Sequence, residues 1–194
     1  MPIQIVYLGW GSLLWRDKNL KIDSWSQTDI EVPLEFSRIS KDGRLTLVID
    51  EANGVKNKLW MAQTKYTNID RAINALKLRE NTLKSGISYI NLPKKKYRIV
   101  NTPPKITQEI VLWALKEGID VVIWTDLPSN WTSIRGSKYS PHDALQYFKT
   151  VPWNIQLKIF DYVYGAVQMG HIKTHFSPKF LTYFGDHIKH LGST

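Results

Sequence analysis

The chain has 194 residues, of which 43% are hydrophobic and 22% charged, a composition that is typical of globular proteins and excludes an intrinsically disordered chain. It contains no cysteine, which excludes disulfide bonds, thiolate metal sites and cysteine nucleophiles. The first residues lack the features of a signal peptide, and no stretch approaches the ~20 apolar residues that span a bilayer. We therefore expect one domain over residues 1–194, located in the cytoplasm and without a membrane partner.

The net charge of +9 is the feature that would favour a nucleic-acid partner. However, the positive residues are scattered, and only Lys94, Lys95 and Lys96 form a run. A solvated loop or strand edge explains this run, and no basic helix, zinc module or RNA-recognition signature accompanies it. We do not expect nucleic acid as a partner, and a basic surface would equally attract small anionic substrates.

The first half of the chain predicts several strands followed by one helix. Strands are expected at residues 3–8, 29–40, 44–50 and 55–66, with a hairpin turn at Asp42-Gly43. The helix is expected over residues 68–84, capped by Asn68 and followed by Gly86. Its apolar stripe consists of Ile69, Ala72, Ile73, Leu76 and Leu83.

The second half predicts a helix-and-strand unit between further helices. Strands near 87–91 and 96–101 precede a short helix over 107–116 and a buried strand over 119–124, a succession that indicates at least one parallel pairing. Ser140 and the proline after it predict the start of a helix that runs to about residue 150. A long helix is expected over 153–169, with a less regular tail from His171. Together the elements predict an α+β fold.

Two features could carry chemistry. The first is the loop after the first strand, which contains Gly9, Trp10, Gly11, Ser12 and Leu13. Glycines allow the backbone to approach a ligand closely, and successive N–H groups can hold an anion. The loop lacks the pattern of a nucleotide site, and a plain tight turn is the alternative.

The second feature is Glu80, which falls on the same stripe as Leu76 and Leu83. A carboxylate among apolar side chains has a raised pKa and becomes a useful acid or base near neutral pH. The alternative is a glutamate at the rim that pairs with Lys77, Lys84 or the neighbouring Arg79. The residues alone favour that alternative.

Three blocks of the sequence resemble conserved segments of the gamma-glutamylcyclotransferase-like superfamily. Residues 6–16 (VYLGWGSLLWR) are similar to the opening of that family, especially of its glutathione-specific branch. Residues 78–80 resemble the segment that holds the catalytic glutamate of the family. Tyr162, Tyr164 and the glycine and alanine that follow are similar to its C-terminal block. The three blocks occur in the family's order and bracket most of the chain.

The resemblance implies a small mixed β-barrel flanked by helices and a reaction that needs no cofactor or metal. A small gamma-glutamyl compound would cyclise to 5-oxoproline and release its amine, with Glu80 as general acid/base. The implied substrate-binding residues are Gly9, Trp10, Gly11, Ser12, Leu13 and Tyr164. The sequence does not indicate the substrate's identity or the oligomeric state.

The chain also departs from the family. Trp10 stands where the family usually has tyrosine, and the residues after Glu80 read NTLKSG without the usual lysine-glycine-glycine-tyrosine continuation. Trp113 to Asn130 has no counterpart in the family. A second hypothesis is therefore a small-ligand or protein-binding module that has the fold without catalysis, and a weaker third is a nucleic-acid-associated protein.

Three other polar residues suggest sites that we do not favour. Asp126 follows a predicted buried strand, and we expect its side chain to cap a turn before Pro128 rather than to bind a ligand. His171 and His175 have the spacing of two metal ligands on a helix, but no acidic partner is adjacent and we expect no metal there.

Overall fold

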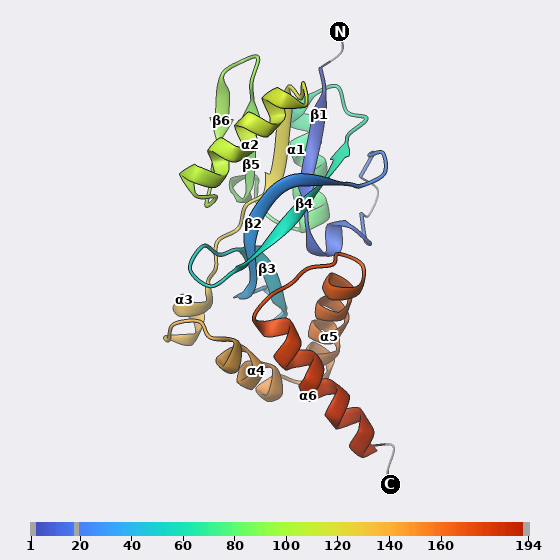
Figure 1. The fold of residues 1–194 in the computed structure, drawn as a ribbon, viewed down its shortest axis with the longest axis vertical. Helices are drawn as coiled ribbons and strands as arrows, with labels where there is room; N and C mark the ends of the chain where they lie inside the picture. The colour runs from blue at the N-terminus through green and yellow to red at the C-terminus, as the bar shows by residue number, and fades with distance from the viewer. Residues whose placement is uncertain (1–2, 18–19, 192–194) are drawn as a thin grey trace. The chain divides into compact units, whose positions relative to one another are not determined.

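The computed structural model describes residues 3–17 and 20–191, the last six as backbone only, and forms the mixed α+β structure that the sequence predicts (Figure 1). Contacts divide the chain into two compact units, each made of two separate stretches. The first unit comprises Met1–Val32 and Lys58–Pro128, and the second comprises Pro33–Asn57 and Ser129–Thr194. The organisation as a single domain stays a prediction.

Among the residues just described, seven strands hydrogen-bond in the order β3-β2-β4-β1-β7-β5-β6. Their bounds are β1 Ile5–Gly9, β2 Ser26–Ile39, β3 Leu45–Ile49, β4 Val55–Gln63, β5 Ile87–Asn91, β6 Lys96–Arg98 and β7 Val121–Thr125. β7 runs parallel to β1, with Tyr7 opposite Ile123, which confirms the predicted parallel pairing. The hairpin between β2 and β3 is also confirmed.

The sheet is open and does not form the closed barrel that the resemblance implies. β6 ends the strand order in the first unit and is only three residues long. Short edge strands that carry lysine are a common way to prevent further strand pairing. β6 begins with Lys96 and therefore has both properties of such an edge strand.

The first unit packs two helices against its strands. α1 (Ile69–Glu80) buries Ala72, Ile73 and Leu76 against side chains of β1 and β7. α2 (Pro104–Lys116) buries a second apolar stripe, and Figure 1 shows it in front of β5 and β7, with α1 behind the strands. Because side chains alternate along a strand, β1 and β7 can serve both helices.

The end of α1 differs from the prediction. Asn68 caps its start as expected, and its side chain accepts a hydrogen bond from the Arg71 backbone N–H at 3.1 Å. The helix stops at Glu80 rather than at residue 84, because Asn81 adopts a left-handed conformation with a φ of 49°. Leu83 therefore lies outside the helix and is 72% exposed, so it does not belong to the apolar stripe.

The second unit surrounds an aromatic core. Its helices are α3 (Trp131–Arg135), α4 (Pro141–Thr150), α5 (Trp153–Gln168) and α6 (Phe176–Leu191). Phe36 of β2 contacts the rings of Tyr162 and Phe176, at centroid distances of 6.0 and 5.6 Å. The irregular tail predicted from His171 is wrong, because Phe176 and Phe180 are fully buried one helical turn apart and anchor α6.

None of the helices within the described residues has the length and apolar character needed to cross a membrane.

Candidate active site

The loop that follows β1 needs glycine at two positions. Gly9 ends β1, and a Cβ atom there would lie 2.7 Å from the Trp25 ring. Gly11 has a φ of 59°, a conformation that side chains disfavour. It begins the short 3-10 helix η1 (Gly11–Leu13), which turns the chain sharply away from the strand. The glycines therefore serve the turn itself, in agreement with the plain alternative.

The backbone of this loop also leaves donors without partners. Leu14 N–H donates to the Gly11 carbonyl at 3.0 Å, and Arg16 N–H donates to the Ser12 carbonyl at 2.9 Å. The N–H groups of Gly11 and Ser12, which open the 3-10 helix, have no acceptor among the residues that the structure describes. Ser12 is only partly buried, whereas Gly11 and Leu13 are buried. Two successive unpaired N–H groups form the kind of backbone arrangement that can receive a carboxylate or carbonyl oxygen.

Glu80 is the last residue of α1, and its side chain is 20% exposed. Its Oε1 forms an ion pair with Nη1 of Arg79. Within the described part of the chain, the other carboxylate oxygen, Oε2, accepts no hydrogen bond. Glu80 is therefore held on one side and free on the other. Its pairing with Arg79 matches the alternative of a paired glutamate, and it does not lie on a continuous apolar stripe.

Arg79 connects Glu80 to the loop after β1. Nη2 of its guanidinium donates to the Ser12 hydroxyl at 3.1 Å and to the Arg16 carbonyl at 2.7 Å. Its Nε donates to the same carbonyl at 3.0 Å. The Arg79 side chain is only 6% exposed, so this planar group is fixed by its contacts. Two predicted site elements, Glu80 and the Gly11–Leu13 loop, are thereby brought together.

A hydrogen bond joins β1 to α1, the two elements next to this site. The Tyr7 hydroxyl donates to the Ala72 carbonyl of α1 at 2.8 Å and so fixes the helix on the strand. Burial raises the pKa of the Tyr7 phenol well above its usual value, so the group stays a neutral donor. The contact joins the two elements that carry the site, since the loop follows β1 and Glu80 is the last residue of α1.

The other two predicted substrate-binding residues with large side chains are Trp10, which is buried, and Tyr164, which is exposed. Trp10 is buried, with 9% exposure. Tyr164 belongs to α5 in the second unit, is 48% exposed and stacks on Phe160 at a centroid distance of 5.5 Å. Its assignment to substrate binding stays a prediction.

Asp126 is a structural hub rather than a ligand site. It is 1% exposed, and its Oδ2 accepts hydrogen bonds from three successive backbone N–H groups, those of residues 100 to 102. Ser88 and Thr102 donate to it through their hydroxyls, at 2.6 and 2.8 Å. The expected capping role is thus observed at a different turn, the one that leads into α2. Segment 113–130 includes this hub and β7, which gives it a role in the core.

The described residues contain no group of three histidine, aspartate or glutamate side chains that could hold a metal ion. His175 instead donates its backbone N–H to Glu35 at 2.8 Å. The sequence reasoning missed Glu35, which is fully buried on β2 and whose pKa is raised by burial. The alternation along β2 puts Glu35 on the opposite face from Ile30, Val32, Leu34 and Phe36, so no pattern in the sequence marks it as buried.

No family model matches the chain, and neither the curated proteins nor the solved structures yield a match.

Proposed function

We propose that the protein is a gamma-glutamylcyclotransferase-like enzyme that converts a small gamma-glutamyl compound to 5-oxoproline and releases the amine. The observation that carries this proposal is the Arg79 guanidinium, which contacts both the Glu80 carboxylate and the Ser12 hydroxyl. Membership of that superfamily and a cytoplasmic location are parts of the same proposal.

In this reaction the free α-amine of the substrate attacks its own γ-carbonyl carbon. A new C–N bond closes the five-membered ring, and the bond to the released amine breaks. The Oε2 atom of Glu80 accepts a proton from the attacking ammonium and, after the ring closes, transfers it to the leaving nitrogen. The ring nitrogen loses a second proton as the bond to the leaving nitrogen breaks, and this proton is taken up by the released amine, so no proton is gained or lost overall. General acid/base assistance of this kind contributes about 10²- to 10⁴-fold in rate.

Binding supplies the rest of the acceleration. The unpaired N–H groups of Gly11 and Ser12 would hold the glutamyl end and orient its amine towards the carbonyl. Holding the two reacting groups in near-attack geometry lowers the barrier by about 7–11 kcal/mol. Arg79 fixes the position of Glu80 relative to the loop because it contacts both.

A specific observation favours a second function, a binding module without catalysis. The Glu80 carboxylate is already ion-paired with Arg79, and Trp10 of the loop is buried. Both features are expected for a binding module in which the Glu80 carboxylate stabilises the fold through its ion pair and takes no part in proton transfer. An activity measurement separates the two functions.

The test measures 5-oxoproline release from a panel of gamma-glutamyl compounds, glutathione included, by wild type and by Glu80→Gln. We expect turnover by the wild type and a loss of about 10²-fold or more in the variant, with the fold unchanged by circular dichroism. Glu109→Gln is the matched control, because Glu109 is an exposed residue of α2 in the same unit.

Equal rates for wild type and Glu80→Gln would remove Glu80 from the mechanism. Absence of turnover with every compound, from a folded wild type, would favour the binding module.

A further inference from the structure

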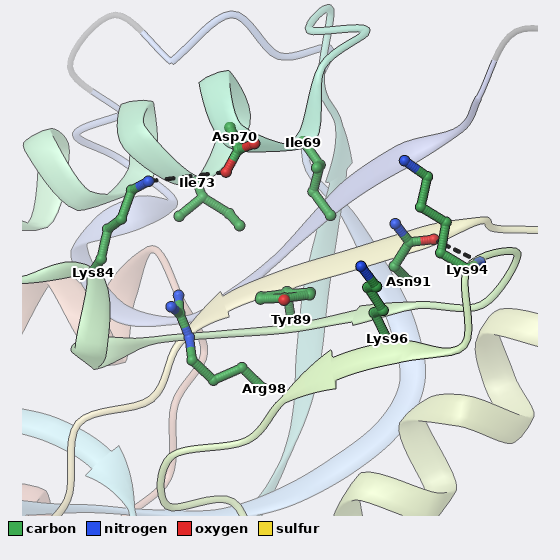
Figure 2. Close-up of a pocket in the computed structure, with 9 residues that line it drawn as sticks. All are labelled: Ile69, Asp70, Ile73, Lys84, Tyr89, Asn91, Lys94, Lys96 and Arg98. Carbon is green, nitrogen blue, oxygen red and sulfur yellow. Dashed lines mark hydrogen bonds and ion pairs between the residues drawn. The ribbon is translucent and has the colours of Figure 1, made fainter.

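A pocket of about 250 Å³ lies in the first unit between α1 and the edge of the sheet. Figure 2 shows side chains of α1 on one side of it and those of β5 and β6 on the other. The Tyr89 ring lies in the centre, on the β5 side. The pocket is formed by residues 69–98 and includes neither Glu80 nor the Gly11–Leu13 loop.

One end of the pocket presents three nitrogen donors. Lys94 and Lys96 form no ion pair with any described residue, and both are exposed. The carbonyl oxygen of the Asn91 side chain accepts the Lys94 backbone N–H at 3.2 Å, which leaves its amide nitrogen without an acceptor in this part of the chain. Figure 2 shows this amide nitrogen and the two ammonium groups at the same end.

A fixed positive charge lies at the other end. Nε of Arg98 donates to the Ile87 carbonyl at 2.8 Å, and the guanidinium lies 5.3 Å from the centroid of the Tyr89 ring. Its Nη2 is buried and has no acceptor among the described residues. A buried cationic donor without a partner is unfavourable, and a nearby anion would offset that cost.

The pocket therefore carries an excess of positive charge. Its lining includes four cationic side chains, of which Lys84 pairs with Asp70 at 3.9 Å. Asp70 is the one acidic lining residue, and its side chain is 74% exposed. A recess lined by charges of one sign concentrates ligands of the other sign.

We propose that this pocket binds a small molecule through a phosphate or diphosphate group. A phosphate has oxygens on several sides and can accept more than one of these donors, and lysine and arginine are the usual partners of phosphate. The volume suits a small anion, because sites for larger organic ligands measure about 300–1,000 Å³. The proposal is independent of the cyclotransferase function.

Isothermal titration calorimetry with inorganic pyrophosphate, at constant ionic strength, tests the proposal. We expect saturable binding of one pyrophosphate per chain, weakened about tenfold or more by Lys96→Gln, because a hydrogen bond to a charged group is lost. Lys95→Gln is the matched control. It removes the same charge one residue away, from a side chain that does not line the pocket, and should change the affinity less than about threefold.

Lys94→Gln repeats the test with a second exposed residue that lines the pocket, in case Lys96→Gln does not fold. Glu80→Gln should bind pyrophosphate as the wild type does, which separates this proposal from the catalytic one.

Absence of saturable binding by folded wild type would overturn the proposal. Equal weakening by Lys95→Gln and Lys96→Gln would overturn it too, because it would indicate diffuse attraction of any polyanion. Citrate that displaces pyrophosphate at an equal concentration would overturn the preference for phosphate.

Discussion

Arg79 shows how one side chain can organise a site that is otherwise built from backbone. Although it lies on the last turn of α1, its side chain is almost fully buried and donates three hydrogen bonds to the loop after β1. Arginine suits this position because its planar group offers five donors in a fixed geometry. Lysine could hold Glu80 but could not reach Ser12 and Arg16 at the same time.

Replacement of this residue should destabilise the protein even if no substrate is ever found. We expect Arg79→Met to lower the free energy of unfolding by about 2 kcal/mol, because Glu80 loses its cation and the loop loses its donors. Urea unfolding of the wild type and the variant measures this difference.

Arg71→Met is the control, because Arg71 is an exposed residue of the same helix. Its effect should stay within about 0.5 kcal/mol. A similar loss for both variants would mean that Arg79 has no special role.

At the scale of the element, the start of α4 is a local interaction that the sequence alone predicts. The Ser140 hydroxyl accepts the Asp143 backbone N–H at 3.0 Å and donates to the Asp143 carboxylate at 2.7 Å. Pro141 occupies the first helical position, where its missing N–H costs nothing. The confirmed start at residue 141 therefore depends on three neighbouring side chains.

Removal of this cap should weaken α4 by a predictable amount. We expect Ser140→Ala to lower the free energy of unfolding by about 1 kcal/mol, since an N–H group of the first turn loses its acceptor. Thermal unfolding by circular dichroism measures the change. Ser137→Ala, at an exposed position before the cap, should have almost no effect, and equal shifts for the two variants would contradict the capping role.

The same contrast between local and distant interactions explains which elements the sequence predicts. The strands at 3–8 and 55–66, the hairpin and the helices starting at 69 and 141 follow from alternation, turn residues and caps close by in the chain. The end of α1 and the existence of α6 do not. Asn81 stops the helix through a backbone conformation, and α6 is fixed by Phe176 packing on Phe36, which is 140 residues away in the sequence.

The candidate site divides in the same way. The loop glycines and Glu80 are conspicuous in the sequence, but their connection through Arg79 is a tertiary contact over 67 residues. The pocket beneath α1 is also non-local, because Asp70 and Arg98 approach it from different elements. The residue types in the sequence therefore predict which side chains could form a site, whereas the contacts between those side chains follow from the tertiary structure.

At the scale of the whole molecule, one buried carboxyl couples stability to pH. Glu35 lies in the second unit with no exposure to solvent, and its two oxygens accept the backbone N–H groups of Phe36 and His175 at 2.8 Å each. Burial raises the pKa of Glu35 above its ordinary value of 4.5, and these two hydrogen bonds offset only part of that effect. The Tyr139 phenol is a further neighbour of the carboxyl, and its pKa is raised as well.

The direction of the pKa shift determines the direction of the pH dependence. Because the folded pKa of Glu35 is raised, its stabilising contribution is fully present below the unfolded pKa of about 4.5 and is lost as the pH rises through the folded pKa. The free energy of unfolding of wild type, minus that of Glu35→Met, should therefore decrease from pH 4 upwards and then level off.

Hydrogen exchange of residues 34–49 during urea unfolding at each pH reports this quantity for the second unit. Glu51→Met, at an exposed position, should give a difference from wild type that does not change with pH. A Glu35→Met difference that stays constant or rises with pH would contradict the raised pKa, because the carboxyl would then be ionised at least as easily in the folded protein as in the unfolded chain.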